Sequence, residues 1–151
     1  MSSLTSWADR HRKQCELQGK PAGVREKMCA TIAPVHERVL IVDDHEPFRA
    51  VARRVLEAAG YVVTGEAADA AEAYAAVEAE PPDAVLLDVR LPDEDGFAIA
   101  RRLTAADGPA VVLISSRDAE EYGTRIDACG ARGFIPKSKL SAAAFTALLS
   151  A

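Results

Sequence analysis

The chain has 151 residues, 49% of them hydrophobic and 27% charged, and 18 basic against 23 acidic side chains give a formal net charge of -5. This composition is typical of one soluble globular domain, and no apolar run approaches the ~20 residues that span a bilayer. The missing apolar leader argues against secretion, the three cysteines argue against a disulfide framework, and the mild acidity argues against nucleic-acid binding. We therefore expect a cytoplasmic protein that contacts neither membrane nor nucleic acid directly.

Residues 1–36 differ from the rest of the chain in charge. They carry six Lys or Arg and three acidic side chains, a net +3, whereas residues 37–151 carry a net -8. They show no sustained helical or strand period, so we interpret them as a mobile basic extension before a domain over 37–151. Met28 is an alternative start, from which the native protein would lack most of the extension. A metal site is the competing interpretation, although its spacing matches no standard zinc motif: His11, Cys15, Cys29 and His36.

From residue 38 onward, short apolar runs alternate with stretches of helical periodicity. The runs lack polar alternation, which indicates strands buried on both faces: 38–42, 61–67, 83–88, 110–115 and 132–136. The stretches between and after them predict five helices: 46–59, 69–79, 96–106, 118–129 and 142–149. Five strand–helix repeats predict an α/β fold, a doubly wound (βα)5 sandwich with helices on both faces of a parallel sheet. Ligands of such sheets bind beyond the carboxyl ends of the strands.

Three carboxylates follow the predicted strands at that edge. Asp43 and Asp44 come after the first strand, and Asp88 ends the third. Each alone is equally well explained as a helix cap or the start of a turn. Together they would repel one another unless a cation relieves them, and hard oxygen ligands of this number suit Mg2+.

The last two strands end in a hydroxyl and a cation. Ser115 closes the fourth strand and can donate a hydrogen bond to an anionic oxygen, while Lys137 follows the fifth on a flexible stem. Taken singly, Ser115 could cap a helix and Lys137 could be a solvated loop lysine. Their occurrence in order with the three acids favours one shared anion-handling site.

The segments IVDDHEPFR, LLDVRLPDEDG, VVLISS and GFIPKS, in this order and spacing, resemble the receiver domain of two-component response regulators (the CheY-like superfamily). The resemblance covers about residues 38–150. It implies a flavodoxin-like fold with a five-stranded parallel sheet in the order 2-1-3-4-5. It also implies that Asp88 is the phospho-acceptor, Asp44 a direct Mg2+ ligand, and Asp43 an acid that acts through metal-bound water.

The same resemblance assigns four further roles. The backbone carbonyl of Arg90 would be the third protein ligand of Mg2+, together with the carboxylates. Ser115 would be the switch hydroxyl, Lys137 the phosphate-binding lysine, and Phe134 the aromatic side chain that changes rotamer. Ser138 stands where many receivers have proline after the lysine.

These roles imply a phosphorylation-activated signalling switch rather than an enzyme with substrate turnover. A sensor histidine kinase or a phosphotransfer protein would supply the phosphoryl group. Residues 118–150 would form the output face, for a downstream protein or for self-association. Two alternatives remain: a receiver fragment of a longer DNA-binding transcriptional regulator, and a receiver-like interaction module that works without phosphorylation. A haloacid-dehalogenase-type phosphatase is disfavoured because Arg90 stands where its second aspartate would be.

Overall fold

The computed structural model describes residues 37–150, which form a five-stranded parallel sheet in the order β2-β1-β3-β4-β5. The strands are β1 (Arg38–Val42), β2 (Val62–Ala67), β3 (Ala84–Asp88), β4 (Ala110–Ser115) and β5 (Gly133–Pro136). All adjacent pairs are parallel, so the predicted fold class and strand order are confirmed. The predicted mobile extension over 1–36 lies outside the described residues, as does the alternative metal set of His11, Cys15, Cys29 and His36.

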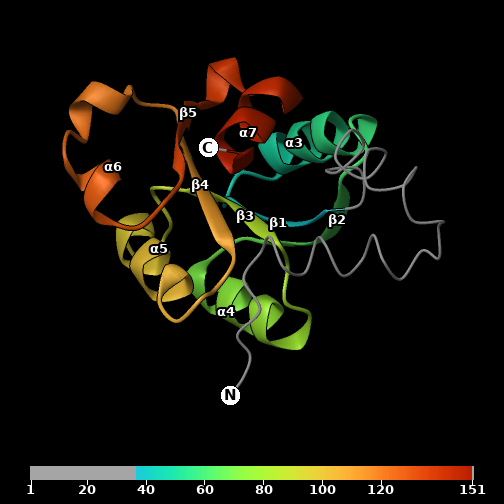
Figure 1. The fold of residues 1–151 in the computed structure, drawn as a ribbon, viewed down its shortest axis with the longest axis horizontal. Helices are drawn as coiled ribbons and strands as arrows, with labels where there is room; N and C mark the ends of the chain where they lie inside the picture. Colours follow the sequence, from blue (N-terminus) through green and yellow to red (C-terminus); the bar gives the residue numbers. More distant parts are fainter. Residues whose placement is uncertain (1–36, 151) are drawn as a thin grey trace, which may run out of the picture.

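Helices cover both faces of the sheet (Figure 1). The α-helices are α3 (Glu46–Ala58), α4 (Ala70–Ala79), α5 (Gly96–Thr104), α6 (Arg125–Ala128) and α7 (Ala142–Ser150), with short 3-10 turns η2 (Ala119–Glu121) and η3 (Lys137–Lys139). Helices α3 and α7 pack on one face of the sheet, and α4, α5 and the segment around α6 pack on the other. Each face therefore closes its own hydrophobic core.

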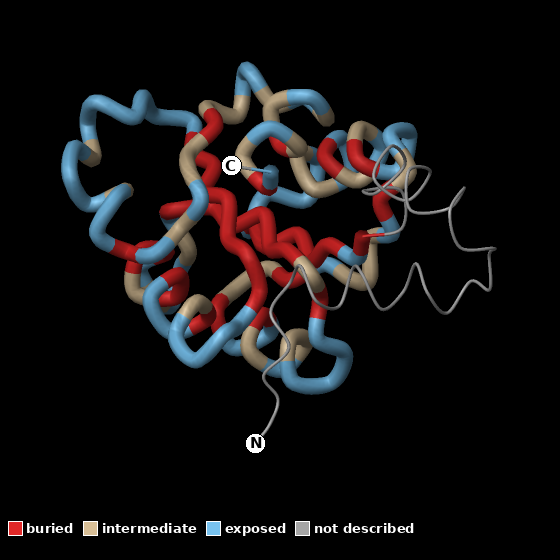
Figure 2. Tube along the Cα trace, viewed as in Figure 1, coloured by how far each residue is buried: buried red, intermediate tan, exposed pale blue. Residues whose placement is uncertain are grey.

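The strands supply alternate side chains to these two cores. In β1, Leu40 and Val42 face α4 and α5, whereas Val39 and Ile41 face α3 and α7. Strands β3 and β4 are buried along their whole length, and the buried band through the centre of the molecule is visible in Figure 2. This explains the unbroken apolar runs of the sequence, because a strand covered on both faces has no position for a polar side chain until it ends.

Polar side chains fix where the helices begin. The carboxylate of Asp69 accepts a hydrogen bond from the backbone N–H of Glu72 at 2.8 Å, which satisfies a donor in the first turn of α4. The hydroxyl of Ser141 accepts from the N–H of Ala144 at 3.1 Å and does the same for α7.

The predicted helix over 118–129 is wrong. This segment contains only η2 and the four-residue α6, separated by Tyr122, Gly123 and Thr124. Gly123 has a φ of +57, a left-handed backbone that ends helical geometry, and glycine is a poor helix former. Tyr122 turns toward the protein interior at the same place, and its ring packs on Phe97 and Phe134. These contacts outweigh the propensity of the flanking residues for a continuous helix.

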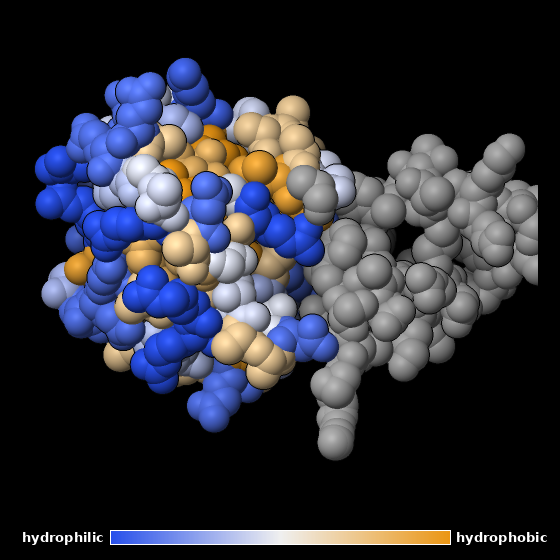
Figure 3. Space-filling model, turned by 60° about the vertical axis from the view of Figure 1, so that its left-hand side comes forward, coloured by the Kyte–Doolittle hydropathy of each residue, from blue (hydrophilic) through white to orange (hydrophobic). Residues whose placement is uncertain are grey.

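The surface of the described residues is mainly polar. Figure 3 shows hydrophilic residues over most of the visible face, with a smaller apolar area among them. The exposed large hydrophobic side chains are Val51 on α3 and Val62 on the edge strand β2. Among residues 37–150, no helix has the length and apolar character required to span a bilayer.

Candidate functional site

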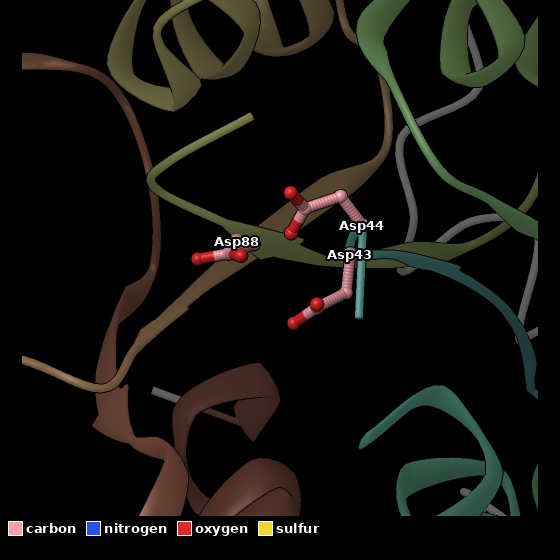
Figure 4. A group of neighbouring side chains, drawn as sticks. All are labelled: Asp43, Asp44 and Asp88. Carbon is pink, nitrogen blue, oxygen red and sulfur yellow. The ribbon is translucent and has the colours of Figure 1, made fainter. Parts of the chain in front are cut away.

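Three aspartates meet at the carboxyl ends of β1 and β3. Asp43 and Asp44 directly follow β1, Asp88 is the last residue of β3, and one carboxylate oxygen of each lies within 4.8 Å of the others. Figure 4 shows the three side chains converging from these two neighbouring strands. Asp43 and Asp88 are buried, while Asp44 is exposed and faces solvent. The predicted acidic cluster is therefore present, with two buried acids and one at the surface.

Backbone and side-chain hydrogen bonds hold Asp43 in place. Its Oδ1 atom accepts from the N–H of His45 at 2.8 Å, and its own N–H donates to the carbonyl of Ala67 at 2.9 Å. The guanidinium of Arg49 donates to the carbonyl of Asp43 at 2.6 Å and to Glu66 on β2 at 3.0 Å. Arg49 therefore ties the turn that carries Asp43 and Asp44 to the edge of the sheet.

Lys137 supplies a cation to the cluster. It follows β5 in the turn η3, and its Nζ lies 2.6 Å from the Oδ2 of Asp43 and 3.5 Å from the Oδ2 of Asp88. The same ammonium lies 4.7 Å from the ring centre of Phe48. Every described peptide bond is trans, so Lys137 reaches the acids although Ser138 rather than proline follows it.

Burial and charge shift the protonation of this group. Burial, and then the negative charge of Asp43, raise the pKa of Asp88 to about 6, although Lys137 works in the opposite direction. Burial alone would lower the pKa of Lys137, but its hydrogen bond to Asp43 and the charge of Asp88 outweigh burial and raise it. At neutral pH Asp88 is thus mostly ionised and Lys137 charged.

The donor set fits a hard divalent cation. It offers carboxylate oxygens from three residues, the kind of ligand Mg2+ takes, and the exposed Asp44 leaves one side accessible to water. One lysine against three carboxylates leaves two negative charges uncompensated when all groups are ionised. Burial is the main cause of the raised pKa of Asp88, and the negative charge of Asp43 is the second. A divalent cation would compensate the excess negative charge.

Ser115 ends β4 at the same edge of the sheet and is buried. Its hydroxyl lies 2.8 Å from the phenol oxygen of Tyr122 and accepts from the backbone N–H of Arg117 at 3.1 Å. Asp88 accepts its hydrogen bonds from the N–H of Arg90 at 3.3 Å and from Lys137. Ser115 is therefore next to the acidic cluster in the sheet but bonded away from it.

Phe134 lies half-buried on β5 and ends a row of three rings. Its centre is 5.8 Å from that of Tyr122, which in turn is 5.3 Å from that of Phe97 on α5. Phe134, the predicted switch aromatic, therefore packs on Tyr122, whose phenol oxygen bonds Ser115, the predicted switch hydroxyl.

Sequence reasoning missed Tyr122 and Arg49. Tyr122 is an aromatic residue within the polar stretch DAEEYGTR, which is the one available sign that it turns inward. The helical period around residue 49 places Arg49 off the apolar face, and no pattern indicates that it reaches a carbonyl. Both contacts depend on where loops lie in three dimensions.

Comparison with known proteins identifies relatives of the whole described domain. The family model of the response regulator receiver domain matches residues 39–148. The probable transcriptional regulatory protein NarL of Mycobacterium tuberculosis is 39% identical over 106 residues, which are 69% of this chain and 49% of that protein. The solved signal receiver domain of NarL from the same organism superposes with a TM-score of 0.69 at 34% identity, covering 78% of this chain and 96% of that one.

A relative of another kind is a protein-glutamate methylesterase/protein-glutamine glutaminase of Anaeromyxobacter dehalogenans. It is 34% identical over 106 residues, which are 70% of this chain and 31% of that protein. The chain thus spans half or less of the length of these two curated relatives. The likeness is to the aligned part of each protein.

Proposed function

This chain belongs to the response regulator receiver family, and we propose that it is a phosphorylation-activated switch that accepts a phosphoryl group on Asp88. The observation that carries the proposal is the position of that carboxylate. Asp88 ends a buried strand between two further acids and Lys137, so a carboxylate, a cation and a candidate metal site face one point. Such a point suits an anion that is transferred rather than bound permanently.

The proposed chemistry forms one bond and breaks one. An Oδ atom of ionised Asp88 attacks the phosphorus of a phosphohistidine, the O–P bond forms, the P–N bond breaks, and the imidazole leaves and takes a proton from water. Lys137 donates to an oxygen of the arriving phosphoryl group from the place where it now contacts Asp88. The pKa of about 6 keeps Asp88 mostly ionised, as a nucleophile must be, at neutral pH.

Magnesium is part of the proposal. Asp44 and Asp88 would be carboxylate ligands, Asp43 would act through bound water, and the carbonyl of Arg90 would complete the protein donors. When bound, Mg2+ would neutralise negative charge on the phosphoryl oxygens. The chain's own contribution is to hold the acids together and to keep Lys137 in reach.

The donor and the receiver of the signal are proposed by chemical class. A sensor histidine kinase or a phosphotransfer protein would supply the phosphoryl group in the cytoplasm. Phosphorylation adds negative charge and three strong acceptors to Asp88, which Ser115 and Lys137 can bind. Residues 118–150, the output face, would then change shape and meet a downstream protein or a second copy of the chain.

The test is the incubation of the full chain with Mg2+ and a small phospho-donor such as acetyl phosphate, followed by intact mass. We expect a gain of one phosphoryl group in the wild type and none in Asp88→Asn. No gain in the wild type, or an equal gain in the variant, would contradict the proposal and favour a phosphorylation-independent interaction module.

A second candidate is a receiver unit of a longer transcriptional regulator. It is supported by the similarity to NarL, because the aligned region makes up 49% of that protein. It differs from the first candidate only in what the output face contacts. The reading frame around the coding sequence would decide between them.

A further inference from the structure

The hydroxyl of Ser115 is bonded to Tyr122, and we propose that Tyr122 positions this hydroxyl in the unphosphorylated protein, so that activation has to break the bond between them. The inference rests on the proposed function, because it concerns the same phospho-acceptor site. Tyr122 is a positioning residue, since it acts through the hydroxyl of Ser115.

The side-chain oxygen of Ser115 occupies one position at a time, either toward the segment after β4 or toward Asp88. Here it lies 2.8 Å from the phenol oxygen of Tyr122, where either atom can be the donor, and it accepts from the N–H of Arg117 at 3.1 Å. Both partners lie in the segment that follows β4. Turning the hydroxyl to a phosphoryl group on Asp88 gives up the bond to Tyr122. Because Ser115 is only 1% exposed, water cannot readily replace that partner.

The position of Tyr122 is itself well determined. Its ring packs between Phe97 and Phe134, at centre distances of 5.3 and 5.8 Å. The guanidinium of Arg125 lies 4.3 Å from the ring centre of Phe97 and extends the same cluster. Tyr122 immediately precedes Gly123, where the backbone breaks the expected helix. Release of the hydroxyl therefore frees a residue that lies within the segment 119–128 and packs on Phe134, both of which belong to the output face.

The substitution Tyr122→Phe isolates the hydroxyl, since it removes one oxygen and keeps the ring contacts. It deletes a bond that exists only in the unphosphorylated arrangement, so it makes the change of state easier. We expect the affinity for a phosphoryl mimic to rise about five-fold, the factor that corresponds to one ordinary buried hydrogen bond. Resistance to denaturant should fall at the same time. A merely structural tyrosine would lower both quantities or leave the affinity unchanged.

The experiment measures the affinity of the full chain for beryllofluoride in saturating Mg2+ by calorimetry. The matched control is Tyr61→Phe, because the phenol of Tyr61 also pairs with a hydroxyl, that of Thr146 at 2.5 Å, but on the other face of the sheet. We expect this control to bind like the wild type. In a Ser115→Ala background, Tyr122→Phe should have no effect on the affinity, since the hydroxyl that it releases is absent.

The outcomes separate this inference from the function on which it rests. A wild type that neither binds beryllofluoride nor gains phosphoryl mass overturns both. A wild type that binds, with equal or weaker binding by Tyr122→Phe, overturns only the role of Tyr122, as does an equal gain in the Ser115→Ala background. The wild type also provides a second measurement by NMR. The ring signals of Tyr122 should shift on addition of beryllofluoride while those of Tyr61 stay, and unmoved Tyr122 signals would overturn the inference.

Discussion

The Nζ of Lys137 lies 2.6 Å from the Oδ2 of Asp43, a side chain with no exposed surface. The lysine stem comes from the turn after β5, and in the sheet order the two strands β3 and β4 separate β5 from β1. The contact therefore joins the turn after β5 to the turn after β1. It places the only described lysine of the cluster against the most buried of the three acids.

Replacement of Lys137 by alanine should destabilise the protein without Mg2+. The variant leaves Asp43 and Asp88 buried beside each other with no cation, so the free energy of unfolding should fall by about 1–3 kcal/mol. Denaturant unfolding in EDTA at pH 7 measures this. Lys139→Ala, an exposed lysine of the same turn, is the control and should change little. An equal decrease in the free energy of unfolding of both variants would mean that the ion pair between Lys137 and Asp43 does not stabilise the protein.

Asp88→Asn should have the opposite effect on stability and abolish phosphorylation. It removes a carboxylate that burial and the charge of Asp43 both disfavour, while Lys137 keeps its contact with Asp43. We expect the free energy of unfolding without Mg2+ to rise by about 0.5–2 kcal/mol, the usual range when a strained functional group is neutralised. Asp118→Asn, at an exposed aspartate, should leave stability unchanged. A less stable Asp88→Asn would show that Lys137 compensates the carboxylate fully.

The stability of the metal-free protein should depend on pH through Asp88. The folded state raises the pKa of this carboxyl from 3.8 to about 6, so between these values the folded chain holds a proton that the unfolded chain has lost. The contribution of Asp88 to the free energy of unfolding must then decrease as the pH rises through this window and level off above it. The difference in unfolding free energy between the wild type and Asp88→Asn should accordingly grow from pH 4 to pH 7. A constant difference would contradict the raised pKa.

The site could be predicted from the sequence where it depends on strand ends. Asp43, Asp44 and Asp88 meet because parallel strands bring their carboxyl ends to one edge, and a run of buried residues marks where each strand stops. Lys137 follows from the same rule. The fold class needs no more than the alternation of apolar runs and helical periods.

The rest depends on contacts that no local pattern contains. The helix expected over 118–129 is broken because Tyr122 contacts side chains outside its own segment. These are the hydroxyl of Ser115 and the ring of Phe97, which come earlier in the chain, and the ring of Phe134, which comes later. Helical periodicity indicates which side of α3 is apolar, yet Arg49 on its polar side bonds the carbonyl of Asp43. Tyr122 and Arg49 both have long side chains that end in a polar group. Which partner that group bonds depends on where neighbouring loops lie, and the pattern of the residue's own helix does not indicate it.

Arg49 offers a direct test of how the acidic turn is held. Its guanidinium donates to the carbonyl of Asp43 and to Glu66, whereas Arg53, one turn further along α3, bonds Glu66 at 2.7 Å and Glu57 at 3.1 Å. Arg49→Met should loosen the turn that carries Asp43 and weaken Mg2+ binding about ten-fold, a typical loss for a supporting contact behind a metal ligand.

Arg53→Met is the matched control for that measurement, because it removes the same charge and a contact with the same Glu66 but none with Asp43. Loss of a nearby positive charge by itself favours a divalent cation, so weaker Mg2+ binding by Arg49→Met alone can only come from the carbonyl contact. Calorimetric titration with Mg2+ at constant ionic strength compares the two variants. If both bind Mg2+ like the wild type, the turn is held without help from Arg49, by the N–H of His45 that donates to the Asp43 carboxylate and by the N–H of Asp43 that donates to the carbonyl of Ala67.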